Sequence, residues 1–181
     1  MKTDARVRYT ISALKQSFLK LLKTKPVNKI TVKEVCDVAE LNRATFYTHF
    51  SDCYDLLERI ENDLIEDFTK SLKYVNTFDV TRLIEAIYDM IDKNYEVCKV
   101  LVFENANVSL LNKMIDIAKK ASILTWKKEL TKAKSEELDM LYTHLSHGLM
   151  CVVIDTYGKY DKKTVAGFIN LMAKNSTATF R

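Results

Sequence analysis

Two helix-start signals follow one another closely in the first third of the chain. The run from Thr31 to Glu34 (TVKE) is a capping box, in which the Thr31 hydroxyl accepts from the Glu34 N–H and the Glu34 side chain reaches back. Asn42 is a second good N-cap residue. This spacing leaves room for a short helix ending near Ala39, a tight turn and a second helix. It predicts a helix-turn-helix, a motif whose second helix enters the DNA major groove in proteins that use it.

Helix-breaking residues are rare in the rest of the chain as well. The 181 residues include only three glycines and one proline. Because apolar residues also recur at helical spacing, we expect helices throughout. The prediction is an all-α protein of about nine helices, with a helix-turn-helix head at residues 1–52 and a helical dimerisation and effector-binding body at residues 53–181. The fourth helix is expected to bridge the two.

Positive charge is concentrated at the start of the chain. The first fifty residues hold ten Lys and Arg against four Asp and Glu, a balance of +6 in a chain whose net charge is +4. A basic head on a near-neutral body is the expected footprint of contact with a polyanion, although a solvated helix face gives the same pattern.

The polar start and the absence of a long apolar run indicate neither a secretory leader nor a membrane span. The four cysteines form no C-x-x-C pair, so we interpret them as small buried residues in a reducing compartment. They are Cys36, Cys53, Cys98 and Cys151. We therefore expect a cytoplasmic protein with no membrane contact.

The segment that starts at Asn42 carries the side-chain types that DNA readers use. Arg43 suits guanine or a phosphate, and Ala44 and the threonine methyl groups suit thymine methyl groups. Thr31, at the start of its helix, suits a phosphate, and Phe46 is expected to face inward. The candidate DNA-binding residues are Thr31, Lys33, Asn42, Arg43, Ala44, Thr45, Tyr47, Thr48 and His49. An ordinary corner between two helices, with a Tyr and a His on its surface, accounts for the spacing equally well.

Residues 31–57 closely resemble the DNA-binding signature of the TetR family. The residues that carry the resemblance are Thr45, Tyr47, His49 and Phe50, followed at the right distance by Leu56 and Leu57. The resemblance implies a dimeric, sequence-specific DNA-binding transcriptional regulator, namely a repressor released by an effector, and not an enzyme. In helix number and size the body is similar to the small-bodied branch of the family, which includes regulators like the dihydroxyacetone-kinase activators.

Three positions depart from the family pattern. Glu40 stands at the turn position where the family has Gly, so the turn needs a non-Gly residue there or a changed backbone. Ala44 replaces a Gly at the start of the recognition helix and adds a methyl group. Cys53 stands where the family often has a phosphate-binding Lys, which predicts a salt dependence of binding shallower by about one unit per lost contact.

The body offers two candidate surfaces. One stripe of the helix from Ser135 to Gly158, together with part of the final helix, is expected to form the dimer interface. Its residues are His144, His147, Gly148, Cys151, Asp155, Phe168 and Leu171. The resemblance also implies an effector cavity in the body, with bulky wall candidates that plain core packing would explain as well. These are Tyr88, Phe103, Met114, Trp126 and Tyr142.

Two rival functions remain open from the residues alone. One is a coactivator or adaptor on the same fold, controlled by a protein partner instead of a small molecule. The other is an enzyme that uses the stripe of His144, His147 and Cys151, as a metal site or as a nucleophile with its base. We expect no metal and no cofactor. The expected partners are a double-stranded DNA operator, a second copy of the chain and a small-molecule effector of unknown identity.

Overall fold

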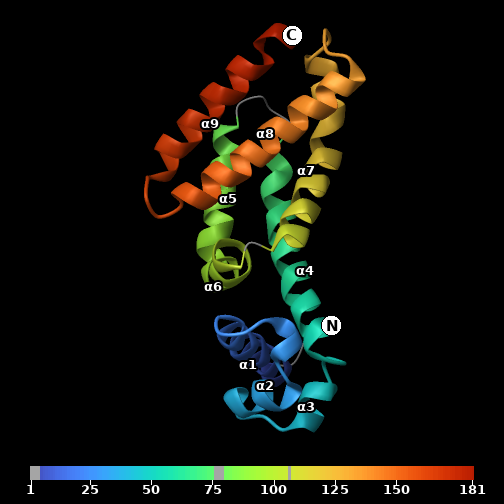
Figure 1. Cartoon of the computed structure of the whole chain (residues 1–181), viewed down its shortest axis with the longest axis vertical. Coiled ribbons are helices and arrows are strands. Elements are labelled where there is room, and N and C mark those ends of the chain that lie inside the picture. The colour runs from blue at the N-terminus through green and yellow to red at the C-terminus, as the bar shows by residue number, and fades with distance from the viewer. Residues whose placement is uncertain (1–4, 76–79, 106) are drawn as a thin grey trace. The chain divides into compact units, whose positions relative to one another are not determined.

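Helices make up all the regular secondary structure in the part of the chain that the computed structural model describes, residues 5–75, 80–105 and 107–181. The α-helices are α1 (Ala5–Leu22), α2 (Val32–Ala39), α3 (Arg43–Tyr47), α4 (Cys53–Ser71), α5 (Thr81–Lys93), α6 (Tyr95–Cys98), α7 (Val108–Glu129), α8 (Ser135–Thr156) and α9 (Lys162–Thr177) (Figure 1). Short 3-10 turns are η1 (Val27–Lys29), η2 (Leu72–Tyr74) and η4 (Ala178–Phe180), and η3 (Lys99–Glu104) is a π-helix. The all-α class and the number of helices are confirmed.

The chain divides into two compact units. The head unit consists of the residues up to Leu64 and the segment Glu96–Asn105, and the body unit consists of Ile65–Tyr95 and the residues from 106 onward. The division falls within α4. A segment distant in sequence, η3 with most of α6, thus belongs to the head unit, where Lys23, just after α1, donates to Glu96 at 2.8 Å.

The core of the head unit is built from one face of each of its helices. α1 packs against α2, and α2 packs against α3. The side chains at the centre are fully buried, and they are Leu14, Phe18, Val35, Phe46 and Leu56. Burial of each such side chain stabilises the fold by about 1.5–3 kcal/mol, so the angle between α2 and α3 is set mainly by this apolar cluster.

The body unit is a bundle in which α5 packs against α9, α9 against α8 and α8 against α7. Its most deeply buried side chains include Ile84, Leu110, Leu130 and Ala166. α8 and α9 run in opposite directions around a turn (Figure 1), and Gly158 in that turn has a φ of +75°, a conformation that glycine adopts without strain.

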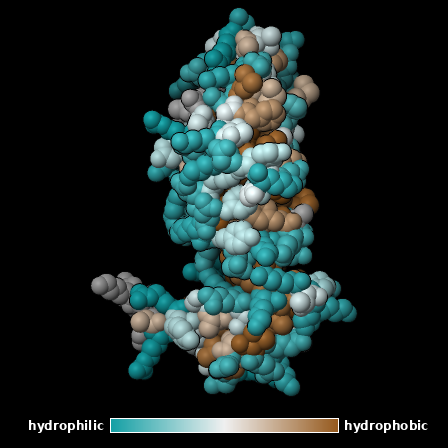
Figure 2. Space-filling model, turned by 90° about the vertical axis from the view of Figure 1, so that its left-hand side faces the viewer, coloured by the Kyte–Doolittle hydropathy of each residue, from teal (hydrophilic) through white to brown (hydrophobic). Residues whose placement is uncertain are grey.

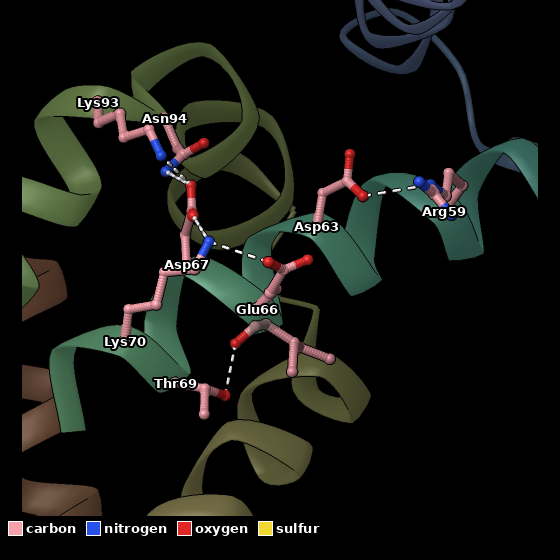
Figure 3. A network of polar contacts seen from close by, with 9 residues as sticks. Arg59, Asp63, Glu66, Asp67, Thr69, Lys70, Lys93 and Asn94 are labelled. Carbon is pink, nitrogen blue, oxygen red and sulfur yellow. Dashed lines mark hydrogen bonds and ion pairs between the residues drawn. The ribbon is translucent and has the colours of Figure 1, made fainter. Parts of the chain in front are cut away.

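Within the body unit, a polar network joins α4 to the end of α5 (Figure 3). The mostly buried Asp67 carboxylate accepts from the ammonium groups of Lys93 at 2.7 Å and Lys70 at 2.9 Å, and from the Asn94 amide at 3.1 Å. These donors, Lys93 first, hold the pKa of Asp67 well below its usual range. The network thus ties α4 to the end of α5 through one carboxylate.

The cysteines are only partly as expected. Cys36, Cys53 and Cys98 are buried, and burial raises the pKa of the Cys98 thiol to about 12. Cys151 is exposed on α8, so its interpretation as a buried residue was wrong for the single chain. Among the helices described, none is both long and apolar enough to cross a membrane.

Candidate nucleic-acid interface

The start of α2 is held by a reciprocal set of hydrogen bonds. The Glu34 N–H donates to the Thr31 hydroxyl oxygen at 3.3 Å, and the Glu34 carboxylate accepts from both the N–H and the hydroxyl of Thr31 at 2.9 Å. Lys25 also donates to Glu34, and this bond, followed by those from Thr31, lowers the pKa of Glu34 to about 2. The expected capping box is therefore present, but the one hydroxyl proton of Thr31 is already donated within the protein.

The turn between α2 and α3 depends on an unusual residue. Glu40 has φ 54° and ψ 39°, which is left-handed backbone, and it is the one non-glycine residue with positive φ in the described ranges. Its N–H donates to the carbonyl of Asp37, and the next N–H, of Leu41, donates to Cys36. Glutamate thus adopts the conformation that suits glycine, at a cost of about 1–2 kcal/mol.

Replacing this residue with glycine should recover part of that cost. Glu40→Gly is expected to raise the free energy of unfolding of the head unit by up to about 1 kcal/mol. Loss of the Cβ removes the clash in the folded state, and the greater conformational freedom of glycine in the unfolded chain offsets part of this gain. Urea denaturation followed by circular dichroism measures the change. Glu40→Ala is the matched control, since it removes the carboxylate but keeps the Cβ. Equal stabilisation by both variants would assign the effect to the side chain and not to the backbone.

α3 is held in place by a buried side chain on its inner side and by a cap at its start. The Asn42 side chain accepts from the Thr45 N–H at 2.7 Å and from the Thr45 hydroxyl at 2.9 Å. Phe46 is fully buried, and its ring lies 5.7 Å from that of Phe50. Asn42 is thus confirmed as a helix cap, and its side-chain oxygen is occupied within the protein.

The opposite side of α3 faces outward in two rows. Arg43 and Tyr47 form one row, and Ala44 and Thr48 form the other, each with the spacing of one helical turn. All four residues are exposed, and Tyr47 is 57% exposed although its ring meets the edge of Phe46. The Thr48 hydroxyl donates to the Ala44 carbonyl at 2.9 Å. Thr45 and His49 are half-buried at the margins of this face.

The start of α4 differs from the pattern of the TetR family. Cys53 is buried and lies in the head core, so this position offers no cation to a phosphate. The Asp52 carboxylate instead accepts from the N–H groups of Tyr54 at 2.8 Å and Asp55 at 2.9 Å. The first free N–H groups of α4 are therefore satisfied by a carboxylate, which would repel a phosphate.

Part of the positive charge of the head unit is neutralised internally. Lys15 pairs with Asp63, Lys23 with Glu96 and Lys25 with Glu34. Lys33 on α2 and Arg43 on α3 are exposed. Both side chains are therefore available to meet a polyanion.

The five residues predicted to line an effector cavity do not lie in one unit. Phe103 belongs to the head unit, and the other four belong to the body unit. Trp126 and Tyr142 pack edge to face at 5.3 Å, and burial raises the pKa of Tyr142 to about 12. Met114 and Tyr88 are buried. The Tyr88 hydroxyl has no hydrogen-bond partner among the described residues, and its ring lies 5.5 Å from that of Tyr157.

The residues predicted for a dimer interface are all exposed in the single chain. On α8 these are His144, His147, Gly148, Cys151 and Asp155, and on α9 they are Phe168 and Leu171, which are 51% and 55% exposed. Figure 2 shows tan and brown, apolar residues among teal ones on one side of the body unit. Within the described residues, no group of three or more His, Cys, Asp or Glu side chains is arranged to hold a metal ion.

Three further residues on this side escaped the sequence interpretation. Met140 and Met172 are exposed, and a Cβ built at Gly167 would meet no atom within 4 Å. Their spacing in the sequence could have identified them. Met140 lies one helical turn before His144, and Gly167 and Met172 flank Phe168 and Leu171. Together with the seven predicted residues they define the α8/α9 face.

Comparison with known proteins places the fold. No known family model matches the chain. An uncharacterized HTH-type transcriptional regulator of Bacillus subtilis (strain 168), YxbF, is 30% identical over 59 residues, which make up 33% of this chain and 16% of that protein. The chain thus spans a small part of the length of this curated relative.

Solved structures of three regulators match nearly the whole chain, each with a TM-score of 0.61. The dihydroxyacetone kinase operon activator DhaS is 15% identical over 95% of this chain and 98% of its own. The fatty acid degradation regulator FadR of Bacillus halodurans is 14% identical over 96% of each chain. A TetR/AcrR-family transcriptional regulator of Aquifex aeolicus VF5 is 17% identical over 92% of this chain and 98% of its own. The chain is TetR-like in fold, with a helix-turn-helix head followed by a helical body.

Proposed function

We propose that the protein is a dimeric, sequence-specific DNA-binding transcriptional regulator of the TetR type that acts as a repressor released by an effector. The observation that carries this proposal is the outward face of α3. Its four exposed residues are Arg43, Ala44 and Tyr47 and the C-cap residue Thr48, and buried Phe46 and the Asn42 cap hold this short helix in place. A rigid, solvent-facing helix with small and cationic side chains is what major-groove reading requires.

The proposed division of labour follows the two parts of the chain. Residues 1–52 would contact DNA through the nine candidate residues from Thr31 to His49, and residues 53–181 would dimerise and bind the effector. Because the Thr31 hydroxyl donates to Glu34, we assign the phosphate contacts beside α2 to Lys33 and the main chain. We place the protein in the cytoplasm, where its DNA target would be.

Dimerisation is proposed through the α8/α9 face. Exposed Phe168, Leu171 and Met172 would be unfavourable on a monomer, and the absence of neighbours around Gly148 and Gly167 allows helices of a second copy to approach closely. A twofold axis through this face would present two recognition helices to one duplex. Such dimers bind pseudo-palindromic half-sites about 34–36 Å apart or a multiple of that distance.

The effector is proposed to bind in the body unit beside Tyr88. Its hydroxyl is buried without a partner among the described residues, which is costly unless another group supplies a hydrogen bond. Release of DNA requires only that the effector binds one arrangement of the dimer better than the other.

The second candidate function, a coactivator controlled by a protein partner, is favoured by the likeness to an operon activator, DhaS. A protein partner that activates transcription without any small molecule would support it over release by an effector.

Loss of the Tyr47 and His49 side chains tests the assignment of the head. Tyr47→Ala combined with His49→Ala should weaken binding to a selected duplex by at least about tenfold, because each hydrogen bond to a charged phosphate contributes about 1.5–3 kcal/mol. Fluorescence anisotropy with a labelled duplex measures the affinity. Tyr160→Ala removes an equally exposed tyrosine from the body unit and should leave binding unchanged. Unchanged affinity of the double variant, with its dimer intact, would reject the head assignment.

A further inference from the structure

The three threonine hydroxyl groups on the candidate DNA-binding face are already committed as donors. Thr31 donates to Glu34, Thr45 donates to Asn42 and Thr48 donates to the carbonyl of Ala44, each at 2.9 Å. A hydroxyl has a single proton to donate. None of these three threonines can therefore donate to a base edge without breaking a bond that holds its own helix start or turn.

The row formed by Ala44 and Thr48 consequently offers methyl groups and no free hydroxyl donor. Both residues are exposed, and they lie one helical turn apart. Because the Thr48 hydroxyl donates its proton to the Ala44 carbonyl, its oxygen can only accept from a ligand, and its methyl group remains as the apolar contact. Ala44 contributes its own methyl group beside it, where the TetR-family pattern has glycine.

Only one base presents an apolar group in the major groove. Thymine carries the C5-methyl group, whereas guanine, adenine and cytosine show donors and acceptors that a methyl row would leave unpaired. From the sequence alone, these side chains could contact several bases. The hydrogen bonds in the structure reduce the choice, because the threonine hydroxyl protons are no longer available to the acceptors of guanine or to the thymine O4.

We propose that Ala44 and Thr48 form a methyl row that reads thymine C5-methyl groups at adjacent positions of each operator half-site. This inference rests on the proposed DNA-binding function. It assigns base preference to van der Waals contact and to the exclusion of water, and it leaves hydrogen-bonded readout to the neighbouring row of Arg43 and Tyr47.

The test begins with the full-length protein and duplexes enriched from a random pool. In the tightest-binding duplex, each thymine is replaced in turn by deoxyuridine, which removes the methyl group and changes no base pair. Affinity should fall about fourfold for each contacted methyl group, at symmetric positions of the two half-sites. Because the protein is unaltered, loss of folding cannot explain such a change. Equal affinity for thymine and deoxyuridine at every position, or half-sites without thymine, would overturn the proposal.

Two variants separate the methyl group from the hydroxyl. Thr48→Val keeps a methyl group and removes the hydroxyl, so it should keep the preference for thymine over deoxyuridine. Thr48→Ser keeps the hydroxyl and its bond to Ala44 and should lose that preference at one position of each half-site. The reverse result would show that the hydroxyl reads the base and would overturn the proposal. Failure to enrich any duplex from the pool would reject the proposed DNA-binding function itself, which distinguishes the two failures.

Discussion

Phe46→Ala is expected to unfold the head unit while the body unit remains folded. Phe46 is fully buried on the inner side of α3, and its ring centroid lies 5.7 Å from those of Phe50 and Tyr47. Truncating a buried phenylalanine costs about 3–5 kcal/mol. This cost is a large share of the about 5–15 kcal/mol that stabilises an entire domain. The surface that would meet DNA should therefore be lost together with its support.

The measurement uses the single tryptophan as a local probe. Trp126 lies in the body unit, packed against Tyr142, so its fluorescence reports on that unit, whereas circular dichroism reports helices in both. In urea, Phe46→Ala should lose part of its helical signal at a lower concentration than wild type, with the Trp126 transition little changed. Tyr47→Ala is the neighbouring control, because its side chain is exposed and its loss should cost little stability. A loss below about 1 kcal/mol for Phe46→Ala would contradict its role as the anchor of α3.

Features that depend on neighbouring residues in the chain were predictable from sequence. The capping box of Thr31 and the caps Asn42, Asn107 and Asp161 are all present, since each is closed by N–H groups within three residues. Neighbouring candidates limit even this. Ser135 is a residue type that favours the N-cap, but α8 begins at Ser135 itself, and Glu137 accepts from the N–H of Lys134 at 2.7 Å.

Features that depend on distant residues were not predictable in the same way. The segment Glu96–Asn105 belongs to the head unit through tertiary contacts such as Lys23–Glu96, and no local sequence pattern predicts such contacts. Burial of Cys53 and exposure of Cys151 are likewise decided by which faces of α4 and α8 pack. In the candidate site, residue types could be inferred from sequence, but the direction of each hydroxyl could not. The bond from the Thr48 hydroxyl to the Ala44 carbonyl is one such direction, and the proposed methyl contact depends on it.

Charge introduced on α9 should separate the proposed dimer. Phe168→Glu combined with Leu171→Glu places two carboxylates on the α8/α9 face of each copy, and a twofold axis brings the same face of both copies together. Juxtaposed like charges cost several kcal/mol, so the dimer dissociation constant should rise by more than about a hundredfold. Analytical ultracentrifugation measures it directly. Binding to a two-half-site duplex should fall in parallel, because a monomer engages one half-site at a time.

The control for this variant lies in the same unit. Leu124 on α7 is 69% exposed and outside the α8/α9 face, so Leu124→Glu makes the same kind of change without altering the proposed interface. Both variants should keep the circular dichroism of wild type, since none of the three side chains is buried in the single chain. A dimer that persists in the α9 variant would place the interface elsewhere. A dimer disrupted equally by Leu124→Glu would show that α7 contributes to the interface and to the spacing of the two recognition helices.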